Sequence, residues 1–202
     1  MKIAVDVALL LPEKINRICI GINAKKDSKS FFNGKNNHPH ITLALGAIDE
    51  KDIPKAVSML ARIAKEFPAL RLETKKIGCD ITPNGKESAH FAIEPNEELS
   101  RLRKQIMTEF LPFFSYKIRL EMFCRDPGEK LNGVSKYWVE NYGKKFVSGK
   151  KHHPHISLKC GKAECKKIPI RFRVSKIALC RLGNYCACRE ILASVKLEKK
   201  GF

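Results

Sequence analysis

The stretch HPHITL at residues 38–43 returns almost unchanged as HPHISL at residues 153–158. Each copy has a His-Pro-His triplet, an isoleucine, a hydroxyl residue and a leucine. Together with His152, the two copies hold five of the six histidines in a chain of 202 residues. Because they lie about half the chain apart, they predict a duplicated structural unit. Packing alone does not explain why both units keep the same histidines.

Similar elements precede the two copies. The first follows a buried strand at 3–10 and a helix that opens at Pro12, and the second follows a strand at 87–95 and a helix capped by Asn96. The remaining pattern predicts a helix at 49–67, a strand at 70–77, a short helix at 134–143, and a closing hairpin of strands at 170–182 and 188–197.

This order of elements predicts an α+β fold. We expect a bilobal, duplicated unit with two mainly antiparallel sheets about a pseudo-two-fold axis, helices on the outer faces and a central cleft. Residues 1–202 then form a single domain of two lobes. The first lobe, at about 1–85, carries the first motif, and the second, at about 86–202, carries the second motif. Whether the lobes exchange terminal strands stays open.

Composition and charge restrict the class of protein. Lys and Arg outnumber Asp and Glu by 39 to 21, and the formal net charge of +18 favours a polyanionic partner such as RNA or a phosphorylated nucleotide. The N-terminal run MKIAVDVALL resembles a signal peptide, but Asp6 interrupts it and no small-residue cleavage site follows. No apolar stretch approaches the roughly 20 residues of a membrane span. We therefore predict a cytoplasmic protein that does not bind membranes.

The eight cysteines allow two interpretations. Cytosolic thiols stay reduced, which favours buried apolar cysteines. A zinc site is the less favoured alternative, because the clusters CGKAEC at 160–165 and CRLGNYCAC at 180–188 lack paired Cys-x-x-Cys knuckles. We predict no cofactor and no metal.

Strand geometry gives the repeated motif a chemical meaning. Side chains alternate between the two faces of a strand, so His40 and Thr42 share one face, and His155 and Ser157 share one face in the second copy. Two imidazoles, one protonated and one neutral near pH 7, can act as acid and base on opposite sides of a phosphodiester. Lys159 has the same strand parity as His155, and could contact the non-bridging oxygens together with the hydroxyls.

Two His-x-[Thr/Ser]-x motifs on strands of related lobes resemble the 2H phosphoesterase superfamily, which includes 2'-5' RNA ligase-like proteins and cyclic nucleotide phosphodiesterases. The resemblance implies metal-independent chemistry at 2' phosphodiester linkages, with His40, Thr42, His155 and Ser157 as catalytic residues. It also implies His40 as the proton donor and His155 as the base, an order that pseudo-symmetry could exchange. Relatives often have arginine five residues after the second motif histidine, where this chain has Cys160.

The predicted activity is therefore hydrolysis of a 2',3'-cyclic phosphate or 2'-5' linkage to a 2'-phosphate, with possible reversal as a 2'-5' RNA ligase. We expect RNA or a nucleotide as partner, with no obligate protein partner, and a monomer. Lys159 and Tyr185 are the candidate substrate-binding residues, and basic loops before each motif could steer the substrate. A non-catalytic RNA-binding protein on the same scaffold is the alternative. His90 is assigned a structural role.

Overall fold

The computed structural model describes residues 1–24, 37–149, 152–158, 161, 163–165 and 168–198. Short 3-10 turns η1, η2 and η3 lie at Glu50–Asp52, Leu120–Met122 and Asn184–Cys186. The helices and strands are, in chain order, β1 (Lys2–Leu10), α1 (Glu13–Ala24), β2 (His40–Asp49), α2 (Ile53–Ala64), β3 (Leu70–Ile81), β4 (Glu87–Ile93), α3 (Glu97–Phe110), α4 (Gly133–Val147), β5 (His155–Ser157), β6 (Arg171–Val174), β7 (Lys176–Leu182) and β8 (Cys188–Lys196).

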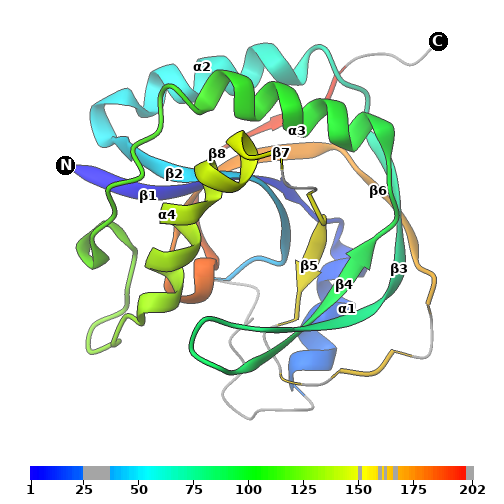
Figure 1. Cartoon of the computed structure of the whole chain (residues 1–202). Helices are drawn as coiled ribbons and strands as arrows, with labels where there is room; N and C mark the ends of the chain where they lie inside the picture. The colour runs from blue at the N-terminus through cyan, green and yellow to red at the C-terminus, as the bar shows by residue number, and fades with distance from the viewer. Residues whose placement is uncertain (25–36, 150–151, 159–160, 162, 166–167, 199–202) are drawn as a thin grey trace.

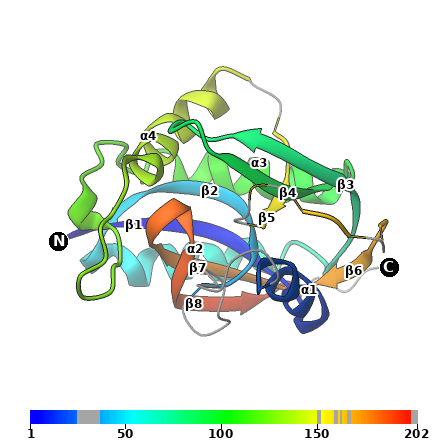
Figure 2. The same ribbon diagram turned by 90° about the horizontal axis from the view of Figure 1, so that it is seen from below.

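The strands form two four-stranded sheets, in the orders β2-β1-β7-β8 and β5-β4-β3-β6. Every neighbouring pair is antiparallel. Helices α2 and α3 pack against each other along one side of the molecule, while α4 lies beside β2 (Figure 1). Seen from below, the two sheets remain separate groups of strands (Figure 2). The predicted α+β fold with two antiparallel sheets is confirmed.

The two sheets do not divide the chain near residue 85. That position lies in the turn between β3 and β4, which pair with each other in the second sheet. The first sheet combines β1 and β2 with β7 and β8 from the end of the chain. The terminal strands therefore come together in one sheet, and the middle of the chain forms the other.

The strand predicted at 170–182 is divided at Ser175. Residues before it form β6, which pairs with β3, and residues after it form β7, which pairs with β1. The burial pattern changes there, from strict alternation in β6 to a nearly continuous buried run in β7, but such a change does not by itself reveal that the chain passes between sheets. The Ser175 carbonyl accepts a hydrogen bond from the Leu197 amide at 3.0 Å, which ties this crossing to the chain segment after β8.

Local signals account well for α3. The Asn96 side chain accepts a hydrogen bond from the Leu99 amide at 2.8 Å, as expected of an N-cap. The predicted apolar stripe of this helix is buried, including Leu102, Ile106 and Phe110. Helix α4 extends beyond the predicted 134–143 at both ends, and Asn132 caps it by accepting from the Val134 amide.

One hydrophobic core joins the two sheets. It contains Val5 of β1, Leu43 of β2, Phe91 of β4, Ile156 of β5 and Phe110 of α3. A shared core fixes the position of one sheet relative to the other, and with it the relative position of the two motifs.

The cysteine prediction needs a correction. Cys180 and Cys188 form a disulfide between β7 and β8, whereas free thiols were expected. Antiparallel pairing brings these two strands together across a short turn, an arrangement that sequence spacing alone does not reveal. Outside the disulfide, Cys19 is buried as predicted for the cysteines, whereas Cys79 is exposed and Cys124, Cys165 and Cys186 are half-buried. Burial, with a contribution from Cys165, raises the pKa of Cys19 to about 12.

Candidate active site

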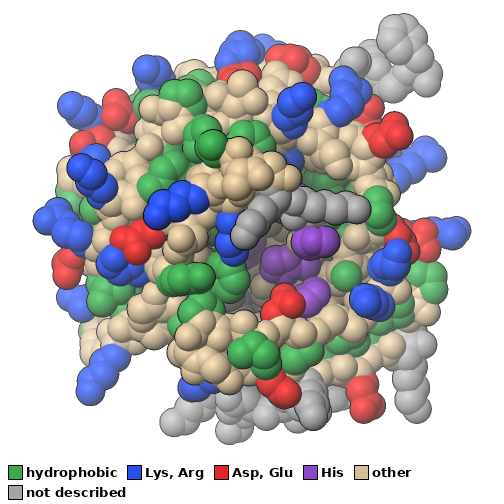
Figure 3. All heavy atoms as spheres, in the orientation of Figure 1, with side chains coloured by type: hydrophobic (Ala, Val, Ile, Leu, Met, Phe, Trp, Pro, Cys, Tyr) green, Lys and Arg blue, Asp and Glu red, His purple; other side chains and the backbone are tan. Residues whose placement is uncertain are grey.

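The two motif strands contact each other. β2 and β5 each form an edge of their sheet, and these edges meet. Leu43, Ile156 and Leu158 are fully buried, as the predicted alternation requires, while His155 is exposed. Histidine side chains gather within a hollow of the surface in Figure 3. The repeated sequence therefore brings histidines from both sheets to one place.

His40 is held by hydrogen-bond acceptors at both ring nitrogens. Its Nδ1 lies 2.8 Å from the carbonyl oxygen of His38, and its Nε2 lies 3.2 Å from Oδ2 of Asp6. Thr42 donates its hydroxyl hydrogen to the same Asp6 oxygen at 2.7 Å. Both ring nitrogens of His40 therefore face oxygen atoms that can accept a hydrogen bond.

Asp6 is a fully buried carboxyl group within the apolar strand β1. Among the described residues, its Oδ1 has no hydrogen-bond donor. Its Oδ2 is contacted by Thr42 and His40. A buried carboxyl group requires polar partners, and the Thr42 hydroxyl and the His40 ring supply them here.

The second motif repeats one of these contacts. Nδ1 of His155 lies 3.0 Å from the carbonyl oxygen of His153. In both triplets, therefore, the backbone of the first histidine fixes the ring of the second, across a proline with a restricted φ. A carbonyl at Nδ1 favours the tautomer with its proton there, which makes Nε2 the proton-accepting nitrogen.

His90 of β4 lies beside the second motif, although we expected a structural role. Its ring centroid is 5.2 Å from that of His155, and its Nδ1 is 3.3 Å from Oδ2 of Asp80. Gly78 makes room for it, because a Cβ at that position would lie 2.4 Å from His90 Nε2. The close approach of β3 thus holds a third imidazole at the site.

A basic and aromatic group borders the same region. The Arg103 guanidinium of α3 lies over the rings of Tyr142 and Phe146, at 5.8 and 5.3 Å from their centroids. Burial, assisted by the charges of Arg103, His155 and His153, lowers the pKa of His152 to about 3. Burial also raises the pKa of Tyr142 to about 12, although Arg103 opposes this shift.

The other predicted residues have different outcomes. Lys159 lies outside the described residues, as do the loop at 25–36 and residues 150–151. Tyr185 has φ 55° and ψ 32° in the turn before β8. The His38 amide donates to the Cys188 carbonyl at 3.0 Å, so this end of β8 lies beside the first motif.

Across the described ranges, no three His, Cys, Asp or Glu side chains are grouped to hold a metal ion.

Two residues at the site were missed by the sequence analysis. Asp6 was used only as the charge that interrupts an apolar run, and that interruption was itself the available signal. His90 stands alone in the sequence and gives no comparable signal.

No helix within the described part of the chain is long and apolar enough to cross a membrane.

Comparisons with known proteins agree with this arrangement. A family model described as the 2'-5' RNA ligase superfamily matches residues 16–124, which include the first motif. No curated protein sequence matches. Among solved structures, TT0787 of Thermus thermophilus has a TM-score of 0.62 at 18% identity, over 98% of this chain and 100% of that chain.

The E. coli protein LigT shows a similar likeness. Its complex with 3'-AMP has a TM-score of 0.53 at 16% identity, over 98% of this chain and 100% of that chain. Its complex with NADP+ gives 0.52 at 17%, over 98% and 99%. At these identities the structures establish the fold, while the family model covers more than half of the chain. The chain therefore belongs to the 2'-5' RNA ligase superfamily of 2H phosphoesterases.

Proposed function

We propose that this protein is a metal-independent phosphodiesterase that hydrolyses 2',3'-cyclic phosphates or 2'-5' linkages of RNA-type substrates to a 2'-phosphate. The observation that carries the proposal is the different setting of two histidines on contacting strands. His40 faces two acceptors, one of them a buried carboxyl group, whereas Nδ1 of the exposed His155 faces a backbone carbonyl. One ring is thus suited to donate a proton and the other to accept one.

His40 is the proposed acid. When the P–O3' bond of a 2',3'-cyclic phosphate breaks, O3' needs a proton, which the imidazolium of His40 supplies. Asp6 acts through His40 as a positioning residue, because it lies at Nε2 and compensates the charge of the protonated ring. Nε2 of His40 gives up its contact with Asp6 and passes its proton to O3' as the bond breaks; before the next turnover His40 regains a proton from solvent and His155 releases the one that it took from water.

His155 is the proposed base. Its Nδ1 is engaged by the His153 carbonyl, so Nε2 takes the proton from the attacking water. The new P–O bond forms as the P–O3' bond breaks on the opposite side of phosphorus, and the product keeps its phosphate on O2'. With the 5'-hydroxyl of an RNA strand in place of water, the same forward steps break the P–O3' bond, form a P–O5' bond and so make a 2'-5' linkage.

The hydroxyls and cations have supporting roles in the proposal. Ser157 pairs with His90 across β4 and β5, and we assign its hydroxyl to a phosphate oxygen. In this structure the Thr42 hydroxyl donates to Asp6, so contact with phosphate requires it to rotate. Arg103 is a further phosphate contact, since its charge reaches His152 at the second motif. Lys159 and Tyr185 remain proposed substrate contacts.

The test is turnover of 2',3'-cyclic AMP in EDTA, with product identity determined by chromatography. His40→Gln and His155→Gln should each lower kcat by about 10²- to 10⁴-fold, the usual contribution of a general acid or base. His153→Gln is the matched control, because the structure uses its backbone carbonyl, and it should keep nearly full turnover. Thermal unfolding of each variant confirms that it is folded.

Continued turnover in either motif variant would contradict the two-histidine mechanism. If the parent protein turns over neither this substrate nor 2'-5'-linked oligonucleotides, while it binds RNA regardless of these substitutions, the non-catalytic RNA-binding alternative replaces the proposal. Restoration of activity only by added divalent metal would contradict the metal-independent part.

A further inference from the structure

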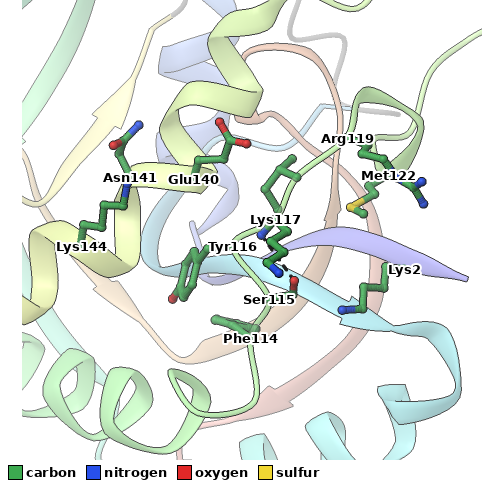
Figure 4. A pocket seen from close by; sticks show the side chains of 11 residues that line it. Lys2, Phe114, Ser115, Tyr116, Lys117, Arg119, Met122, Glu140, Asn141 and Lys144 are labelled. Carbon is green, nitrogen blue, oxygen red and sulfur yellow. Dashed lines mark hydrogen bonds between the residues drawn. The ribbon is translucent and has the colours of Figure 1, made fainter.

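A basic groove lies at the opposite end of β1 from the histidines. Lys2, at the start of β1, lines it, whereas Leu10, at the end of β1, pairs with His40. The groove has a volume of about 1170 Å³. Its lining residues are Lys2, Phe114, Ser115, Tyr116, Lys117, Ile118, Arg119, Met122, Glu140, Asn141 and Lys144 (Figure 4).

The groove is built on the edge of the first sheet. The Ser115 and Ala47 backbones exchange hydrogen bonds of 2.8 and 2.9 Å, which fixes the chain after α3 against β2. Phe114 packs onto Gly46, where a Cβ would lie 2.2 Å from its ring. Helix α4 provides Glu140, Asn141 and Lys144 on the other side (Figure 4). The segment carrying Lys117 and Arg119 is thus attached to a rigid strand.

The charges of the groove are not balanced. Lys2, Lys117, Arg119 and Lys144 are all exposed, and none of them forms an ion pair with another described residue. Glu140 is the one acidic residue of the lining, and it is already paired with Lys136. Four cations therefore face the groove without a neutralising partner in the described part of the chain, which suits a polyanion.

Helix α4 connects the groove to the histidine site. Asn141 and Lys144 line the groove, while the hydroxyl of the intervening Tyr142 donates to the Leu43 carbonyl, next to Thr42. The eight residue steps of β1 between Lys2 and Leu10 correspond to at most about 26 Å at about 3.3 Å per residue. A mononucleotide cannot occupy both places, but a strand of several nucleotides can.

We propose that this basic groove binds the phosphate backbone of an RNA strand whose reacting linkage lies between His40 and His155. The location of the reacting linkage rests on the proposed function, whereas backbone binding by the groove does not. RNA is favoured over an acidic protein because the groove and a site suited to a phosphodiester share one helix. The groove adds affinity for long substrates without contacting the reacting atoms.

The test compares two double variants with the same loss of charge. Lys117→Gln/Arg119→Gln removes two groove cations. Lys65→Gln/Arg71→Gln removes two exposed cations at the far end of α2 and the start of β3, where neither enters an ion pair with a described residue. Binding of a single-stranded RNA of about twelve nucleotides, a length typical of such sites, is measured by fluorescence anisotropy at several salt concentrations.

The groove variant should bind this RNA less tightly. The slope of log K against log salt concentration should become less negative by about 1.4, because each of the two lost phosphate contacts contributes about 0.7 to the slope. This corresponds to about a 25-fold loss of affinity at 0.1 M salt, taking 1 M as the point where the electrostatic contribution vanishes. The control variant should change affinity by less than about threefold. Turnover of 2',3'-cyclic AMP should be the same in both variants and the parent.

The outcomes separate the two proposals. Equal RNA affinity and salt slope in the groove and control variants would overturn RNA binding by the groove, whatever the activity. Displacement of the RNA by polyglutamate at matched charge concentration, as effectively as by unlabelled RNA, would overturn the assignment to RNA. Absence of turnover with a groove-dependent salt slope would leave backbone binding intact and refute the proposed function alone.

Discussion

The pairing of Asp6 with His40 can be measured directly by a double-mutant cycle. The four proteins are the parent, Asp6→Asn, His40→Ala and the double variant. A second Asp–His pair provides the matched control: Asp80 and His90 are 3.3 Å apart, almost the 3.2 Å of Asp6 and His40. The pairs differ in burial, because the Asp6 side chain is fully buried and that of Asp80 is 70% exposed.

The structure sets the size of the expected coupling energies. Two unit charges about 3.2 Å apart attract by about 5 kcal/mol at an effective dielectric constant near 20. Desolvation offsets part of this, so we expect a coupling energy of about 2–4 kcal/mol for Asp6 and His40. Solvent screening at the exposed carboxylate should keep the coupling of Asp80 and His90 below about 1 kcal/mol.

The assay is urea unfolding at pH 6, with both cycles measured in the same buffer. His40→Ala alone should be the least stable protein of its cycle, because it leaves Asp6 buried and uncompensated. Asp6→Asn should also lower kcat on 2',3'-cyclic AMP by about ten- to a hundredfold, whereas Asp80→Asn should stay within about twofold. A coupling energy for Asp6 and His40 no larger than that of the control would refute the reasoning that these two residues form a buried ion pair.

Three further predictions concern the motifs and the groove. The pKa of His152 is lowered to about 3 in the folded protein, so the unfolded chain takes up this proton at higher pH. The free energy of unfolding should therefore fall by up to about 1.4 kcal/mol per pH unit as the pH drops from about 6.5. His152→Asn should remove this loss in urea titrations at pH 7 and 4.5, and an unchanged pH dependence of stability would contradict the prediction. Pro154→Ala should loosen the contact between the His153 carbonyl and the His155 ring, and so lower the measured kcat by about fivefold. A loss of kcat no larger than that of His153→Ala would contradict this prediction. Gly46→Ala should destabilise the protein by about 1–3 kcal/mol, because the added methyl group would overlap the Phe114 ring. Thermal unfolding tests this prediction. The control is Gly21→Ala, because Gly21 is exposed and has open space around it.

Local sequence patterns predict much of the fold. The repeated triplets, the Asn96 cap and the alternation around Ile156 all depend on neighbours within a few residues, and sequence reveals such neighbours directly. The assignment of strands to sheets depends on non-local pairing. The break at Ser175 is marked in the sequence only by two polar residues, Ser175 and Lys176, which do not show that β6 and β7 belong to different sheets.

The candidate site, too, has a part that local sequence predicts and a part that depends on non-local strand pairing. His40 and Thr42 could be placed on one face of a strand because they are two residues apart. Their contact with Asp6 depends on the register of β1 against β2, which shifts by one residue between Val7 and Ala8. The position of His90 depends similarly on its pairing with Gly78. Registers of this kind are set by the packed sheet as a whole.

The placement of β7 and β8 in the first sheet has a consequence during protein synthesis. β1 lies between β2 and β7, so its hydrogen bonds on one side stay unmade until residues 176–182 leave the ribosome. Both histidine triplets will by then have been translated. A nascent chain that ends shortly after the second triplet therefore holds every histidine of the site but lacks the strand that completes the first sheet. We expect such a chain to expose the β1 edge to chaperones, and the site to mature only after β7 has emerged.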